Sequence, residues 1–152
     1  MILGYSNKGH DGFLGNSVIG EWCNLGADTN TSNLKNNYTN VKLWDYQSSR
    51  FTDTELLFCG LIMGDHSKCS FNMMFNTGTS VGVSANIFGS GFPRNFIPSF
   101  SWGGSQGTTT YKLEKVFEVA ELVMQRRGIH LSELDKGILE HVFMFTKIHR
   151  RD

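Results

Sequence analysis

The sequence predicts a mainly β chain: a parallel β-helix built from hexapeptide repeats, followed by C-terminal α-helices. Three observations support this fold class. Apolar residues recur every six positions in two stretches, and the turn-forming residues Gly, Asn, Ser and Thr are concentrated before residue 111. Charge is concentrated after it, because 15 of the 28 charged side chains of this 152-residue chain lie in residues 111–152.

The six-residue period is clearest between residues 57 and 91. It is occupied there by Leu57, Met63, Cys69, Phe75, Val81 and Ile87, and in an earlier stretch by Phe13, Ile19, Leu25 and Thr31. A spacing of six matches neither the strand period nor the helix period. It fits a short strand and a tight turn that send one side chain per pass into a narrow interior, as in β-helix repeats. An ordinary β-sandwich with a chance period is the alternative.

The two stretches are out of phase, because Phe13 and Leu57 are 44 residues apart and 44 is not a multiple of six. We therefore expect an excursion, a hairpin or a loop, at about residues 36–56 of a β-helix domain that spans residues 1–107. Residues 92–107 are aromatic and glycine-rich. We expect them to pack as extended chain on the flank of the coil.

Residues 108–152 are expected to form a C-terminal helical hairpin. Apolar residues at i, i+3, i+4 spacing run from Leu113 to Met124, and Gly128 follows as a stop signal. Ser132 is a good N-cap for the second helix. The open end of a β-helix needs covering, so the hairpin either caps that end or lies along the side of the coil.

Composition excludes several classes of function. The chain has 14 Lys and Arg against 14 Asp and Glu, so it lacks the net positive charge of a general nucleic-acid binder or of a polybasic membrane anchor. No apolar run is long enough to cross a membrane. The three cysteines have no disulfide or zinc spacing, which favours a cytoplasmic setting and predicts no metal. We expect Cys23 and Cys69 to be core residues.

Residues 8–40 carry the chemistry-bearing segments of the sequence. They include Gly-His at 9–10, Asn-Leu-Gly-Ala-Asp-Thr at 24–29 and Ser-Asn-Leu at 32–34. In composition and spacing this stretch resembles the acetyltransferase domain of the bifunctional enzymes that make UDP-N-acetylglucosamine. The whole chain is similar to the C-terminal part of sugar-phosphate nucleotidyltransferase-like proteins. We therefore expect it to be a fragment that lacks an upstream nucleotidyltransferase domain.

The resemblance implies a left-handed coil, a homotrimer, and acetyl-CoA-dependent acyl transfer to the amine of an amino-sugar phosphate. His10 matches the general base of that family, and a histidine is suited to this role because its usual pKa lies near neutrality. Asn24 matches a sugar contact, and Phe13 stands where the family has a sugar-binding tyrosine. Ala27 and Asn33 match positions that line the acetyl-CoA and oxyanion side.

Two further residues are weaker candidates. Lys35 is a local candidate for a phosphate contact, together with Lys8 and Lys42. His66 is either a rival base, a residue that faces the coenzyme across a subunit interface, or simply a residue on the surface of the coil. His10 itself, in a polar turn, is either the base or merely exposed.

Three departures from the family pattern keep other functions open. Phe13 and Leu34 lack the hydroxyls of the tyrosines that they replace, and Asp28 replaces a glycine. The alternative is a non-catalytic β-helix that trimerises or regulates a sugar nucleotidyltransferase. A third possibility is a sensor in which the 36–56 excursion and residues 92–104 bind a sugar nucleotide.

Overall fold

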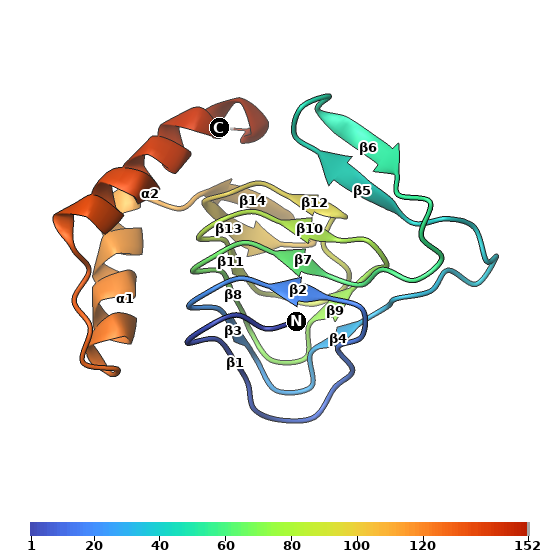
Figure 1. Cartoon of the computed structure of the whole chain (residues 1–152), viewed down its shortest axis with the longest axis horizontal. Helices are drawn as coiled ribbons and strands as arrows, with labels where there is room; N and C mark the ends of the chain where they lie inside the picture. The colour runs from blue at the N-terminus through green and yellow to red at the C-terminus, as the bar shows by residue number, and fades with distance from the viewer. Residues whose placement is uncertain (152) are drawn as a thin grey trace.

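The computed structural model describes residues 1–151, which form a stack of short parallel strands, a projecting hairpin and two C-terminal helices (Figure 1). The strands of the stack are β1 (Asn7–Lys8), β2 (Val18–Ile19), β3 (Asn24–Leu25), β4 (Asn30–Thr31), β7 (Ile62–Met63), β8 (Lys68–Cys69), β9 (Met74–Phe75), β10 (Ser80–Val81), β11 (Asn86–Ile87), β12 (Phe96–Ile97) and β13 (Ser101–Gly104). Within the described residues, no helix has the length and apolarity needed to span a membrane.

The strands pair in parallel across successive turns of the chain. One sheet has the order β12-β10-β7-β2, a second begins β1-β3-β8-β11-β13, and a third pairs β4 with β9. Each turn of the chain therefore adds a strand to more than one sheet, an arrangement compatible with a β-helix-like fold. The fold is mainly β with parallel sheets and two C-terminal helices, as the sequence predicts.

The interior of the stack is lined by the repeating residues. Eight of the ten six-residue positions are buried, and these are Ile19, Leu25, Thr31, Met63, Cys69, Phe75, Val81 and Ile87. In-register pairing stacks them between turns, as where Ile19 stands opposite Met63 and Leu25 opposite Cys69. Each of these pairs is 44 residues apart, so the two frames that look out of phase in the sequence are aligned in space.

Two of the ten positions do not point inward. Phe13 is 53% exposed and Leu57 is 38% exposed. Asn7 pairs with Asn24, 17 residues later, and the same offset places Leu14, not Phe13, opposite Thr31. Leu14 packs against the core accordingly. The period of six fails at Phe13 because the first turn is one residue shorter than the 18-residue turns, and at Leu57 because this residue precedes β7, where the stack resumes.

The excursion contains an antiparallel hairpin of β5 (Lys42–Asp45) and β6 (Arg50–Asp53) that projects from the stack (Figure 1). Between β3 and β8 the chain needs 44 residues to return to the same sheet, whereas between β7 and β10 it needs 18. The additional residues form the hairpin and its two connections.

Residues 92–107 differ from the sequence prediction, because the stack continues through them as a further turn. Strand β12 pairs with β10 and β13 pairs with β11. The repeat is hidden there because Gly103 takes the inward position opposite Ile87. Strand β14 (Gly107–Thr110) then folds back antiparallel on β13.

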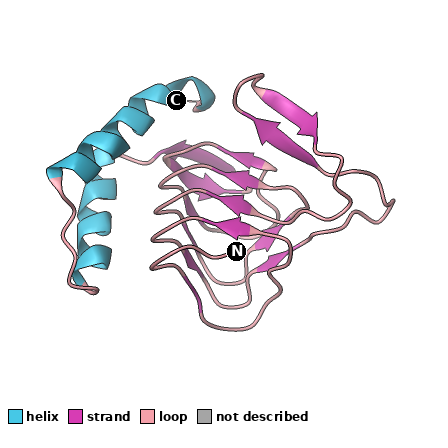
Figure 2. Cartoon of the chain, in the orientation of Figure 1, coloured by secondary structure: helices cyan, strands magenta, loops and turns pink. Residues whose placement is uncertain are grey.

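Helices α1 (Leu113–Gln125) and α2 (Glu133–Phe145) lie along the side of the stack (Figure 2), and a short 3-10 helix, η1 (Lys147–His149), follows them. The apolar faces of these helices pack against the turns on one side of the stack and form a second hydrophobic cluster with them. It contains Trp22, Phe100, Val116, Ala120, Met124, Leu131 and Leu139. Of the two placements that the sequence leaves open, the structure therefore shows the lateral one.

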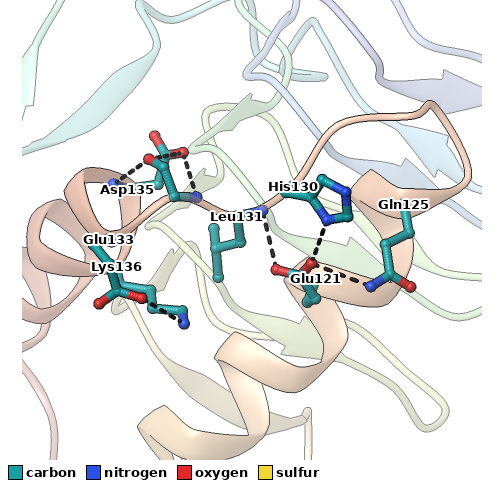
Figure 3. A network of polar contacts seen from close by, with 8 residues as sticks. Glu121, Gln125, His130, Leu131, Glu133, Asp135 and Lys136 are labelled. Atoms are coloured by element: carbon teal, nitrogen blue, oxygen red, sulfur yellow. Dashed lines mark hydrogen bonds and ion pairs between the residues drawn. The ribbon is translucent and has the colours of Figure 1, made fainter.

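Local polar contacts shape the turn between the two helices (Figure 3). Ser132 is the N-cap of α2, and it forms a capping box in which its hydroxyl accepts from the Asp135 N–H at 3.1 Å. The Glu121 carboxylate accepts from the Leu131 N–H at 3.0 Å and lies 3.1 Å from His130 Nδ1. These contacts confirm the predicted cap and fix where the chain reverses.

Candidate functional site

The loop that carries His10 is held by its own neighbours. Lys8 Nζ donates to the backbone oxygens of His10 at 3.0 Å and Asp11 at 2.7 Å. Gly12 has a φ of +116°, and a Cβ at this position would lie 2.1 Å from the carbonyl oxygen of Thr29. Only glycine fits such a close approach of backbone to backbone, so the lysine and the glycine together define the course of the loop.

Strand register places Ala27 beside this loop. Lys8 stands opposite Leu25, and the same 17-residue offset puts His10 at the level of Ala27 in the next turn. Asn24 is exposed on the outer face of the same sheet, where its Oδ1 accepts from Asn7 Nδ2 at 3.2 Å. The residues aligned with the base, the sugar contact and one coenzyme contact therefore lie on two adjacent turns.

The other half of the candidate surface is formed by Phe13 and Asn33. The Phe13 ring and the Asn33 amide both approach Gly15, at 2.3 and 3.0 Å from where its Cβ would lie. Asn33 Nδ2 donates to Asn16 Oδ1 at 2.8 Å. The Phe13 N–H donates to Asn30 Oδ1 at 2.8 Å. An exposed aromatic ring thus lies beside a row of side-chain amides.

The imidazole of His10 is exposed and has no hydrogen bond within residues 1–151. Both ring nitrogens are therefore accessible to a bound molecule. The surrounding amides can donate to and accept from the hydroxyls of a sugar or the carbonyl of a thioester. The surface is open, so it supplies the polar groups of a binding site without enclosing a ligand by itself.

The structure places His66 away from His10. It precedes β8, whereas His10 follows β1, so the two histidines flank opposite ends of parallel strands in one sheet. The His66 ring is stacked 6.3 Å from Trp22 beneath the helices, and its Nδ1 is buried without a partner in the described chain. Burial, and then the charge of Lys68, lowers the pKa of His66 to about 4.

Lys35 also lies apart from the His10 surface. Its Nζ donates to the Asn40 carbonyl oxygen at 3.0 Å, and the side chain lines a cleft of about 970 Å³. This cleft lies between the hairpin, the last turn of the stack and the C-terminal tail, and of the other candidate residues only Lys42 lines it.

The sequence analysis anticipated two sides of this cleft, because its third hypothesis has the 36–56 excursion and residues 92–104 bind a ligand together. The signal available was the clustering of aromatic residues at 44–51 and 92–96, which supports the third, sensor hypothesis. The contribution of the C-terminal tail at residues 148–151 has no signal in the sequence, because that tail is far from both segments along the chain.

No metal-binding cluster is found among residues 1–151, in which no three His, Cys, Asp or Glu side chains come together. The three cysteines are free and buried. Burial raises the pKa of the Cys23 thiol to about 11, so this group is protonated at neutral pH and behaves as a core residue.

Comparison with known proteins gives one informative similarity. No family model matches the chain. A bifunctional GlmU protein of Methanocaldococcus jannaschii is 38% identical to it over 87 residues, which is 57% of this chain. The chain spans about a fifth of the length of that relative, because the match covers 21% of it. The chain is thus similar to one part of a bifunctional protein.

Proposed function

We propose that this chain is an acyltransferase domain that transfers the acetyl group of acetyl-CoA to the amine of an amino-sugar phosphate. The observation that carries the proposal is the strand register, which brings His10, Asn24 and Ala27 onto two adjacent turns. The similarity to part of a GlmU protein supports it. The domain would act in the biosynthesis of sugar nucleotides, as the C-terminal part of a nucleotidyltransferase-like protein.

The amine attacks the thioester in its neutral form, so the reaction needs a base to take the proton that the nitrogen loses as it bonds to carbon. His10 accepts a proton from the amine as the nitrogen bonds to the acetyl carbon. The carbon–sulfur bond then breaks, and the same proton passes to the departing thiolate of CoA. Backbone or amide donors near Ala27 and Asn33 stabilise the negative charge on the intermediate oxygen. Asn24 and the ring of Phe13 hold the sugar, while Lys35 and His66 remain weaker candidates for substrate and coenzyme contacts.

The proposed assembly is a homotrimer of left-handed hexapeptide β-helices. The His10 surface is open within one chain, and the His10 imidazole has no residue to orient it. A neighbouring copy packed against this surface would exclude water and supply the missing contacts, which an acyl transfer requires.

The test measures CoA thiol release from acetyl-CoA with glucosamine 1-phosphate as the acceptor. We expect His10→Ala to lower turnover by roughly 10²- to 10⁴-fold, the usual contribution of a general base, without changing acetyl-CoA binding or the trimer. His141→Ala is the matched control, because His141 is exposed on α2. Full activity in His10→Ala would refute the assignment of the base.

A non-catalytic role in trimerisation or regulation is the second candidate. It is favoured by the exposed Phe13, which has no hydroxyl to hold a sugar, and by the unsupported His10 imidazole. If the chain has this role, we expect it to form a trimer that shows no acetyl-CoA binding in calorimetry and no acetyl-CoA turnover. Turnover that depends on acetyl-CoA excludes this role.

A further inference from the structure

A second site is suggested by the cleft at the end of the stack. Its floor is the last turn, where β12 is the outermost strand of its sheet and Ile97 and Gly103 are inward residues. One wall is the β5–β6 hairpin, and the C-terminal tail closes another side (Figure 1). A volume of about 970 Å³ suits a ligand larger than a single phosphate or sugar.

The charges that line the cleft all have one sign. Lys42, Arg94 and Arg151 come from three separate segments, and among residues 1–151 no Asp or Glu lines the cleft. Within the described part of the chain, neither Lys42 nor Arg94 forms an ion pair. Asp53 stands opposite Lys42 in the hairpin, but its Oδ1 accepts from the Glu55 N–H at 2.7 Å and it does not line the cleft.

Aromatic rings form the wall beside these cations. Trp44 of the hairpin stacks on Phe96 of the last turn, with ring centroids 4.1 Å apart and an angle of 6° between the planes. His149 of the tail meets both rings edge-on, at 6.0 and 5.8 Å. This packing holds the hairpin and the tail in place, so the cleft is preformed rather than dependent on a ligand.

We propose that this cleft binds a nucleoside diphosphate group, with the diphosphate held by Arg94 and Lys42 and the base placed against the wall formed by Trp44 and Phe96. Arginine is well suited to phosphate oxygens because its donors form a planar fork. Aromatic side chains provide a surface for a base of any type. Lys42 and Arg94, with no carboxylate beside them among the described lining residues, match a group of several negative charges better than they match a neutral sugar or a peptide.

The site is independent of the proposed acyl transfer. His10, Asn24 and Ala27 do not line the cleft. Lys35 and Lys42 do, but neither is needed for the proton transfer, and Lys42 is assigned here to the diphosphate instead of the sugar phosphate. The two proposals can therefore fail separately.

The test is calorimetric titration of the full chain with UDP, which carries a diphosphate without the adenosine part of CoA. We expect one site per chain, with a Kd below about 1 mM. Arg94→Gln and Lys42→Met should each raise the Kd roughly tenfold, as expected for a charge-assisted hydrogen bond. Arg127→Gln, at an exposed position in the turn after α1, is the control for net charge. His10→Ala should bind UDP as the unmodified chain does.

Two further ligands test the assignment of the parts. Pyrophosphate should bind about tenfold more weakly than UDP because it lacks a base to stack, and uridine should show no measurable heat. Equal affinity for pyrophosphate and UDP overturns the role of the aromatic wall. The site itself is overturned if UDP gives no heat at millimolar concentration, or if the Arg94 and Lys42 variants bind as the Arg127 variant does. Circular dichroism confirms that each variant is folded.

Discussion

The half-buried His66 should make the attachment of the helices sensitive to acid. In the folded chain its pKa is about 4, against 6.5 for an exposed histidine, mainly because burial disfavours the charged imidazolium. The charge of Lys68 adds to this effect, whereas Asp65 and Asp135 oppose it. Unfolding therefore takes up a proton wherever the pH lies between these two values.

The sign and size of the effect follow from this difference. Above pH 6.5 the residue is neutral in both states and contributes no pH dependence. As the pH falls from 6.5 to 4, the unfolded state gains protons that the folded state does not, and the free energy of unfolding decreases. At 1.36 kcal/mol per pH unit, the largest loss is about 3 kcal/mol, and about 2 kcal/mol is lost by pH 5. Below pH 4 the effect does not grow further.

The assay is urea unfolding of the unmodified chain and of His66→Asn at pH 7.5, 6, 5 and 4.5. Asparagine does not titrate in this range, and it tolerates the φ of +60° at this position. Subtracting the two curves cancels the contributions of the other titrating groups. On acidification from pH 7.5 to 4.5, we expect the unmodified chain to lose about 2–3 kcal/mol of unfolding free energy relative to His66→Asn. A difference that stays flat from pH 7.5 to 4.5 would show that His66 is not buried in the neutral form.

Further predictions test the packing, the helix cap, the candidate site and a buried thiol. Phe100 is fully buried between the stack and the helices, so Phe100→Ala should lower the free energy of unfolding by about 3–5 kcal/mol in urea. Ser132→Ala removes the cap of α2 and should cost about 1 kcal/mol in the same assay. Gly12→Ala forces a Cβ to within 2.1 Å of the Thr29 oxygen. Thiol release from acetyl-CoA should therefore fall in this variant although His10 is intact. The pKa of Cys23 is about 11, so at pH 8 it should react with a disulfide reagent only after urea has unfolded the chain; rapid labelling of the folded chain would contradict its burial.

The core could be predicted from sequence where turns of equal length repeat. A side chain enters the interior once in six residues as long as strands and turns keep their length, which holds from Met63 to Ile87. It fails at Phe13, because the first turn is a residue shorter, and at Leu57, which precedes the stack's return. The period of six also does not reveal the last turn, because the inward position there is occupied by Gly103 and not by an apolar residue.

The candidate site was predictable only in part, for a similar reason. His10, Asn24 and Ala27 are near one another in sequence, so one strand register brings them together. His66 could not be placed from sequence, because its surroundings are set by α1 and α2. Whether a histidine on a turn faces solvent or a helix depends on where the helices pack, and no local pattern encodes that.

The sequence by itself determined the features that depend on short-range interactions. These are the repeat, the β-helix-like class, the two helices and the cap at Ser132. These depend on residues within a few positions of one another, where backbone preferences and side-chain periodicity act directly. Only the tertiary structure decided that the helices lie along the side of the stack and that the hairpin, the last turn and the tail enclose a cleft. Those features bring together segments more than 50 residues apart, as Trp44 and His149 show. Their proximity depends on the length of the excursion and on the packing of rings that no local preference specifies.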